Sequence, residues 1–235
     1  MASLEESVAM AVAALSAIGW LLYFRWKDRA RPEPPWIMAA AAGGGMAAVL
    51  LAFLGYRLGG AAGADTSWEQ LQDAPALPAI AAALRVGGVE EVCKLVVVLP
   101  IALWASHFDE VLDGIVYAAC SAAGFATAET AWLFTHGEWA FGDALGRGVV
   151  APITHALLAA PWGLGLSLAL LRRRRWALPL GLLLSITAHA AYDLLLARPG
   201  VPPALSAVVM LALWLWFLRA APRLAREAPV VRAPP

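Results

Sequence analysis

The sequence predicts an all-α protein, a polytopic transmembrane bundle of about seven helices, and three observations lead there: composition, long apolar runs and segregated basic residues. Of the 235 residues, 61% are hydrophobic and 14% are charged, whereas ordinary soluble domains have about 45–50% apolar and about 25% charged residues. No stretch has the composition of a soluble domain. We therefore expect one transmembrane helical domain over residues 1–219 and a Pro- and Arg-rich cytoplasmic tail over residues 220–235.

Seven apolar runs approach or exceed the length that a helix needs to cross a bilayer, about 20 residues. They span residues 7–24, 36–55, 76–104, 114–135, 147–171, 176–197 and 203–219. The third run is long for one crossing, because a helix of that length extends about 43 Å. It is expected to tilt, protrude or break, and Gly87-Gly88 is its weakest point.

Basic residues orient the predicted bundle, since they favour cytoplasmic segments. With the N-terminus outside, twelve of the 17 basic residues fall on cytoplasmic segments, and only Arg57, Arg147 and Arg198 fall outside. The twelve are Arg25, Lys27, Arg29, Arg31, Arg172 to Arg175, Arg219, Arg223, Arg226 and Arg232. The sequence thus predicts a multi-pass protein of the cell membrane with its C-terminus in the cytoplasm. The loop Ser106 to Asp113 is then cytoplasmic and acidic.

Ionisable residues inside the spans are the strongest functional signal, because each charge costs about 2.5–3.5 kcal/mol on insertion scales. Lys94 lies four residues after Glu90 and three after Glu91, so on a helix it can reach either carboxylate. The two glutamates point about 100° apart, which leaves one of them to face something else. The set comprises Arg85, Glu90, Glu91, Lys94, Glu129, His155, His189 and Asp193.

The depths of these residues suggest one shared cavity. At about 1.5 Å per residue, Glu129, His155, His189 and Asp193 lie about 6–12 Å from the predicted outer ends of their helices. Glu90 and Glu91 lie about 21 Å along the overlong third run. We expect all six to meet around one wet cavity in the outer half of the membrane.

Three kinds of chemistry suit this set of side chains. In hydrolysis, a carboxylate takes a proton from water while an imidazolium or an acid polarises the scissile carbonyl. In a zinc site, histidines and carboxylates hold a metal that acidifies its bound water. In a transporter, the same groups relay protons. Acyl-enzyme chemistry is the weaker hypothesis, since no serine or cysteine accompanies a histidine in the manner of a nucleophile.

Four motifs in order carry a resemblance to a known family. Glu90-Glu91-Val92-Cys93-Lys94 is similar to its EExxK, and residues 122–130 are similar to its GxxFAxxEN, with Ala122 and Thr130 in place of Gly and Asn. His155 through Gly163 is similar to its HxxxxxxxG, and His189 through Asp193 to its HxxxD. Over residues of about 85–195 the chain thus resembles the PrsW-type intramembrane proteases, site-1 proteases of anti-sigma factors within the wider CAAX-prenyl-protease-like group.

The resemblance implies an endopeptidase with a catalytic core of about residues 76–197. It would cut a single-span, anti-sigma-factor-like membrane protein near the outer face. Glu90 or Glu91 would activate water, His155 and His189 would stabilise the oxyanion or hold a metal, and Glu129 and Asp193 would orient them. Lys94, Phe125 and Gly163 would support the site. Glutamic and metal-dependent mechanisms both stay open; for zinc, the candidate ligands are Glu129, His155 and His189.

Other functions remain as alternatives. CAAX-like and bacteriocin-immunity proteases carry an arginine after the paired glutamates, where this chain has Lys94. A proton-coupled transporter would need polar residues at several depths, and a non-catalytic scaffold would bind single-span proteins without cutting them. Membrane lipid is an expected partner, nucleic acid is not, and the oligomeric state is left open.

Overall fold

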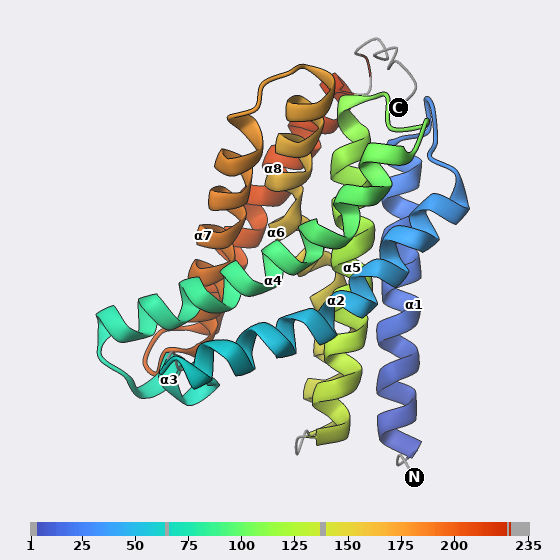
Figure 1. The fold of residues 1–235 in the computed structure, drawn as a ribbon. Coiled ribbons are helices and arrows are strands. Elements are labelled where there is room, and N and C mark those ends of the chain that lie inside the picture. Colours follow the sequence, from blue (N-terminus) through green and yellow to red (C-terminus); the bar gives the residue numbers. More distant parts are fainter. Residues whose placement is uncertain (1–3, 64–65, 137–139, 225, 227–235) are drawn as a thin grey trace.

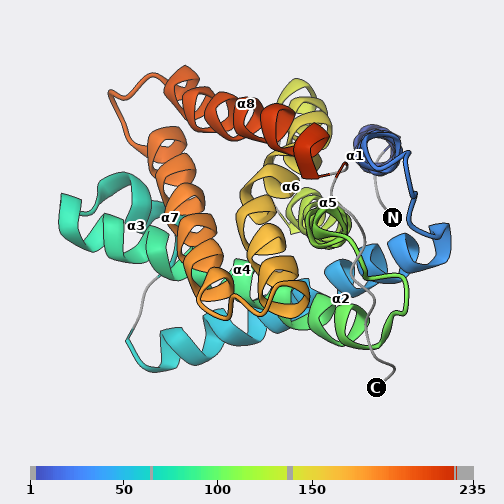
Figure 2. The same ribbon diagram turned by 90° about the horizontal axis from the view of Figure 1, so that it is seen from above.

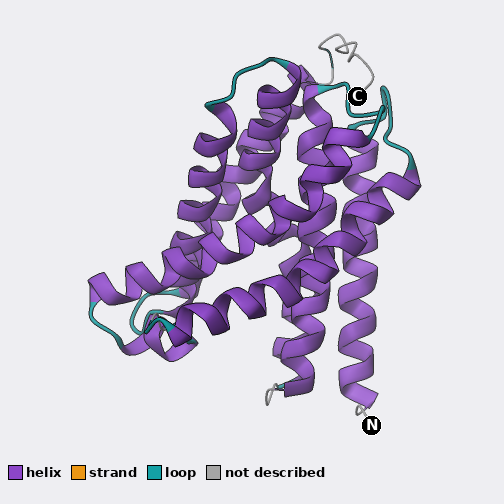
Figure 3. Ribbon diagram, in the orientation of Figure 1, coloured by secondary structure: helices purple, strands orange, loops and turns teal. Residues whose placement is uncertain are grey.

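The fold is a bundle of helices throughout the part of the chain that the computed structural model describes, residues 4–63, 66–136, 140–224 and 226 (Figure 3). In chain order the helices are α1 (Leu4–Lys27), α2 (Pro35–Ala61), α3 (Trp68–Asp73), α4 (Ala76–Trp104), α5 (Val111–His136), α6 (Phe141–Leu171), α7 (Ala177–Ala197), the 3-10 turn η1 (Pro203–Leu205) and α8 (Ser206–Leu224). The prediction of an all-α fold is confirmed.

Six of the seven predicted spans are confirmed as helices long and apolar enough to cross a membrane: α1, α2, α5, α6, α7 and α8. The remaining predicted span, residues 76–104, is the third along the chain and corresponds to α4. The bounds of α4 coincide with the predicted range, but α4 is not among the six helices. It is the helix that carries Glu90, Glu91 and Lys94, whose charges offset its apolar character. The chain is a multi-pass membrane protein.

Helix α4 is continuous from Ala76 to Trp104, so of the three expected outcomes, a tilt, a protrusion or a break, it does not show a break at Gly87-Gly88. Instead α4 and α2 slope across the more upright α1 and α5, which accommodates the length of α4 (Figure 1). Gly87 has a packing role, since a Cβ there would lie 3.1 Å from the His189 Cβ. This glycine therefore lets α4 approach α7 at His189.

Helix α5 forms the centre of the bundle, enclosed by α1, α2, α4 and α6 (Figure 2). Glycines let its backbone touch two neighbours, a common device for packing helices in membranes. A Cβ on Gly45 of α2 would collide with the Ser121 carbonyl, and one on Gly163 of α6 would lie 2.5 Å from the Gly114 carbonyl oxygen. Gly163 thus fixes the α5–α6 crossing.

The two ends of the molecule differ in charge. The α1 C-terminus, the α6–α7 connection and the α8 C-terminus, which carry the basic clusters, share one end, while α3 and the N-terminus lie at the other (Figure 1). Which end faces the cytoplasm stays a prediction. The connection between α2 and α4 contains the short helix α3, and α8 continues past residue 219 to Leu224. The rest of the predicted tail, apart from Arg226, lies outside the described residues.

Candidate active site

A polar cavity of about 170 Å³ lies between α4, α5, α6 and α7. Five of the six predicted catalytic residues line it, and the sixth, Glu91, lies directly behind its wall, bonded to His189. The five are Glu90, Glu129, His155, His189 and Asp193. Folding therefore brings the predicted set together from four helices. Trp68 of α3 also lines the cavity. Because α3 lies at the end of the bundle opposite the basic clusters (Figure 1), the cavity lies toward that end.

Lys94 lies at the centre of the site and serves both glutamates. Its Nζ donates to Glu91 Oε1 at 2.8 Å and to Glu90 Oε2 at 3.2 Å, and it lies 4.3 Å from the ring centre of Phe125. All three charged residues are buried. The local spacing on α4 thus produces the predicted ion pairs, and Phe125 of α5 covers the ammonium group.

Glu91 has no oxygen left for a water molecule. Its Oε1 contacts Lys94 and His189 Nδ1, the latter at 2.8 Å, and its Oε2 accepts a hydrogen bond of 2.9 Å from Trp162 Nε1. The residue is fully buried. Glu91 is therefore placed to hold other groups in position.

Glu90 is the glutamate that faces the cavity. Tyr56 donates to its Oε1 at 2.9 Å. Its Oε2 lies 3.8 Å from His155 Nδ1 and 3.7 Å from His189 Nε2, too far for hydrogen bonds. Apart from the contact with Lys94, this oxygen is directed at the space between the two imidazoles, where water can reach it.

The hydrogen-bond network assigns the histidine tautomers. An ammonium group only donates, so His155 Nδ1, 2.9 Å from Lys94 Nζ, accepts, and His155 Nε2 carries the hydrogen toward Glu129 Oε2 at 3.4 Å. His189 Nδ1 donates to the Glu91 carboxylate. His189 Nε2 then faces the cavity, 3.6 Å from Asp193 Oδ2.

Three further residues take part that the sequence reasoning missed: Tyr56, Arg147 and Trp162. Arg147 lies within α6 and forms an ion pair of 2.8 Å with Glu129, and its expected outer position stays a prediction. Arg147 and Trp162 lie eight residues before and seven after His155, which is the spacing of one helix face, so periodicity could have found them. Tyr56 carries no such signal, because it comes from α2.

Comparison with known proteins is consistent with this geometry. The family model of the PrsW family intramembrane metalloproteases matches residues 33–218. The chain belongs to this family. It is 34% identical over 147 residues to a protein named Protease PrsW from Geobacillus kaustophilus, covering 61% of this chain and 64% of the relative. It is 31% identical over 116 residues to a Protease PrsW from Clostridioides difficile, covering 47% of this chain and 49% of the relative. No solved structure matches the chain.

The donor set of this PrsW family member fits the metal that the family name implies. Ligand atoms of Glu90, His155 and His189 lie within 4.8 Å of one another. Two ligands of a tetrahedral zinc ion lie about 3.3 Å apart, close to the two Glu90–histidine separations of 3.7 and 3.8 Å. Both histidines of the predicted zinc set are in this group, but its carboxylate is Glu90, because Glu129 is paired with Arg147.

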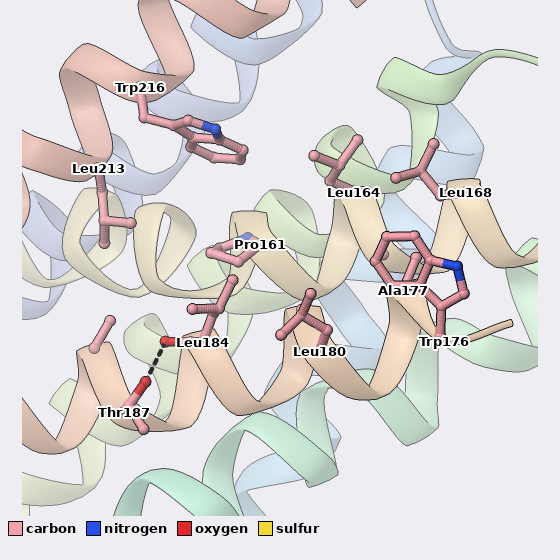
Figure 4. A pocket seen from close by; sticks show the side chains of 13 residues that line it. Pro161, Leu164, Leu168, Trp176, Ala177, Leu180, Leu184, Thr187, Leu213 and Trp216 are labelled. Atoms are coloured by element: carbon pink, nitrogen blue, oxygen red, sulfur yellow. Dashed lines mark hydrogen bonds between the residues drawn. The ribbon is translucent and has the colours of Figure 1, made fainter. Parts of the chain in front are cut away.

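A second hollow of the PrsW family chain is an apolar groove of about 540 Å³ between α6, α7 and α8 (Figure 4). Leu213 and Trp216 of α8 face Pro161 of α6 and Leu184 of α7 across it (Figure 4). Among the described residues, none that lines the groove is ionisable. Ionisable side chains line the polar cavity between α4, α5, α6 and α7 instead.

Proposed function

We propose that the chain is an intramembrane endopeptidase in which Glu90 activates the attacking water. The observation that carries the proposal is the placement of Glu90 Oε2, which lines the polar cavity with an imidazole nitrogen on either side at 3.7 and 3.8 Å. The substrate class is a single-span membrane protein, anti-sigma-factor-like, cut near the membrane face on the α3 side. That face is the predicted outer one.

In the first step, Glu90 takes a proton from a water molecule in the cavity as the water oxygen attacks the scissile carbonyl carbon. The carbonyl π bond breaks, and its electron pair becomes the oxyanion. His189 Nε2 faces the cavity, and in the imidazolium form it donates to that oxyanion. Glu90 then returns the proton to the leaving amine as the C–N bond breaks, which releases a carboxylic acid and an amine.

The other residues hold this machinery in place. Glu91 orients His189 through Nδ1, in the manner of carboxylate–histidine pairs that fix a tautomer. Lys94 bridges the two glutamates and so holds both in position, and Tyr56 holds the Glu90 oxygen that faces away from the histidines. Asp193 Oδ2 lies 3.6 Å from His189 Nε2, where it would help to orient this imidazole.

If a metal is bound, Glu90, His155 and His189 would hold it, and it would acidify a bound water molecule and polarise the carbonyl. Lys94 would have to release His155 Nδ1 if that nitrogen became a ligand. Metal analysis of the purified protein decides this: about one zinc per chain, absent from the double variant His155→Ala/His189→Ala, would show a metal centre. Full cleavage activity without bound metal would show the glutamate–histidine mechanism.

The activity is tested by comparing membrane proteins in cells that express the wild type, Glu90→Gln or Asp143→Asn. Asp143 is exposed at the start of α6 and serves as the charge control. Mass spectrometry counts peptides that end at new sites next to single transmembrane segments. We expect such products with the wild type and the control, and a loss of about 100-fold or more with Glu90→Gln, since a general base contributes about 10²–10⁴-fold. Equal products in wild type and Glu90→Gln would overturn the proposal.

A further inference from the structure

A second buried cluster of carboxylates lies at the other end of the molecule. Asp28 follows α1, Glu110 immediately precedes α5 and Asp113 belongs to the first turn of α5. Their exposed fractions are 0%, 3% and 1%. Asp113 lies twelve residues before Phe125, about 18 Å along α5. This cluster is therefore separate from the candidate active site.

One oxygen of each carboxylate is committed to a hydrogen bond that fixes the side chain. Asp28 Oδ2 accepts from the Glu33 backbone N–H at 3.1 Å, and Glu110 Oε1 accepts from Arg31 Nη1 at 2.6 Å. Asp113 Oδ2 accepts from the backbone N–H groups of Asp109 and Glu110 at 2.8 and 2.7 Å. The orientation of all three carboxylates is thus set before any ligand binds.

Two of the remaining oxygens, Asp28 Oδ1 and Glu110 Oε2, are buried and have no hydrogen-bond partner. Such atoms are rare in folded proteins, because an unsatisfied buried acceptor costs about 1–3 kcal/mol and more when charged. Oxygens of Asp28, Glu110 and Asp113 lie within 4.8 Å of one another. Two of the three carboxylates in this group thus have a buried oxygen without a hydrogen-bond donor, which indicates that the group can accept a cation.

The charge balance of the cluster indicates the same. Glu33 adds a fourth carboxylate, which accepts a hydrogen bond of 2.9 Å from Tyr117, and Arg31 forms an ion pair with Glu110. All four carboxylates are buried, and buried carboxylates held close together without a compensating charge cost free energy. A divalent cation would offset that cost.

We propose that Asp28, Glu110 and Asp113 bind a divalent cation that prefers oxygen ligands, with Ca²⁺ fitting best. Oxygens bound to one Ca²⁺ at about 2.3–2.6 Å can lie up to about 5 Å apart, which the spacing within 4.8 Å satisfies. Mg²⁺ would require contraction to about 4 Å or less, and zinc prefers nitrogen and sulfur ligands. Water completes the coordination shell.

A bound ion would tie the α1–α2 connection to the start of α5, the helix that carries Phe125 and Glu129 into the active site. Its role is to fix the end of the central helix, and no step of the proposed catalysis passes through it. The cation site therefore stands or falls independently of the peptidase activity.

The test is Tb³⁺ luminescence of the full-length protein in detergent, stripped with EDTA and then titrated with Tb³⁺ in place of Ca²⁺. Tyr117, which contacts Glu33 within the cluster, is the sensitising aromatic residue. We expect one saturable site per chain that Ca²⁺ competes for at about 0.1–1 mM or below. Asp28→Asn and Glu110→Gln should each weaken binding about tenfold or more, since ligand charge sets affinity in such sites.

The matched control is Asp109→Asn, which removes a charge from the same loop, although the Asp109 side chain is not one of the three ligands. Asp109→Asn should weaken cation binding less than about threefold, because it removes only a more distant charge whose attraction for the cation is screened by salt. The variant His155→Ala/His189→Ala should bind as the wild type does, which separates this site from the active site. A third ligand variant, Asp113→Asn, is not required: if it fails to fold, Asp28→Asn and Glu110→Gln still test the cation site.

No saturable signal with Tb³⁺ or Ca²⁺ would overturn the proposal, as would an Asp28→Asn protein that binds like the wild type. Equal weakening by Asp109→Asn and Asp28→Asn would also overturn it, since that result means a diffuse charge effect. Circular dichroism of each variant, recorded before titration, confirms that the helices are intact.

Discussion

Replacing Glu91 by glutamine is expected to cost stability, whereas the same replacement of Glu90 is expected to cost activity. Glu91 is fully buried, and its carboxylate receives hydrogen bonds from Lys94, His189 and Trp162. Glutamine keeps one acceptor oxygen and turns an NH₂ group toward another donor. Breaking a buried ion pair by removing one partner costs about 3–5 kcal/mol. Since each kcal/mol lost lowers the melting temperature by about 2–4 °C, Glu91→Gln should melt about 6–20 °C below the wild type.

Glu90→Gln should melt closer to the wild type than Glu91→Gln does. Its oxygen can still accept from Tyr56, and the contact that it loses is the longer one, 3.2 Å from Lys94. The loss of one such charge-assisted bond costs about 1.5–3 kcal/mol, or about 3–12 °C. Activity should fall about 10²–10⁴-fold, because the amide cannot take the proton from water.

The assay pairs thermal unfolding of the detergent-purified variants with cleavage of a single-span substrate identified by the proteomic comparison. Asp143→Asn, on the exposed start of α6, is the control for loss of one charge. The reasoning is refuted if Glu91→Gln melts like the wild type while Glu90→Gln is destabilised. It is also refuted if Glu90→Gln retains wild-type turnover.

Three further outcomes are expected. Tyr56→Phe should lower turnover about tenfold with little change in melting temperature, because the base loses a charge-assisted hydrogen bond; unchanged turnover would contradict this. Gly163→Ala should destabilise by about 1–3 kcal/mol, since its Cβ would lie 2.7 Å from the Ala118 Cβ, whereas Gly88→Ala, with nothing within 4 Å, should be neutral or stabilising by up to about 1 kcal/mol. The third outcome concerns protein from which EDTA has removed divalent cations. Burial raises the pKa values of Asp28 and Glu33 from 3.8 and 4.5 to about 7, so the folded state binds more protons than the unfolded state. The melting temperature should therefore fall as pH rises from about 4 to 8. Bound Ca²⁺ should reduce this fall in melting temperature. A melting temperature that rises from about pH 4 to 8 without Ca²⁺ would contradict the raised pKa values of Asp28 and Glu33.

Much of the site follows from local sequence. The spacing of Glu90, Glu91 and Lys94 places the ion pairs on one helix, and the structure has them at 2.8 and 3.2 Å. The depth of Glu129, His155, His189 and Asp193 was calculated from helix rise alone, and these residues do share a cavity. The sequence did not predict the partner of Arg147, because its ion pair with Glu129 joins two different helices.

The sequence by itself determined the helical membrane class, six spanning helices and the residues of the candidate site, because apolar length and i, i+4 spacing act within one helix. Tertiary structure alone decided which glutamate is open to water, since Trp162 and His189 close off Glu91 from two other helices. It also decided that Asp28 meets Glu110, 82 residues away in the chain, at one buried point. Contacts of that kind depend on how helices pack against one another, and the spacing of residues along a single helix does not specify that packing.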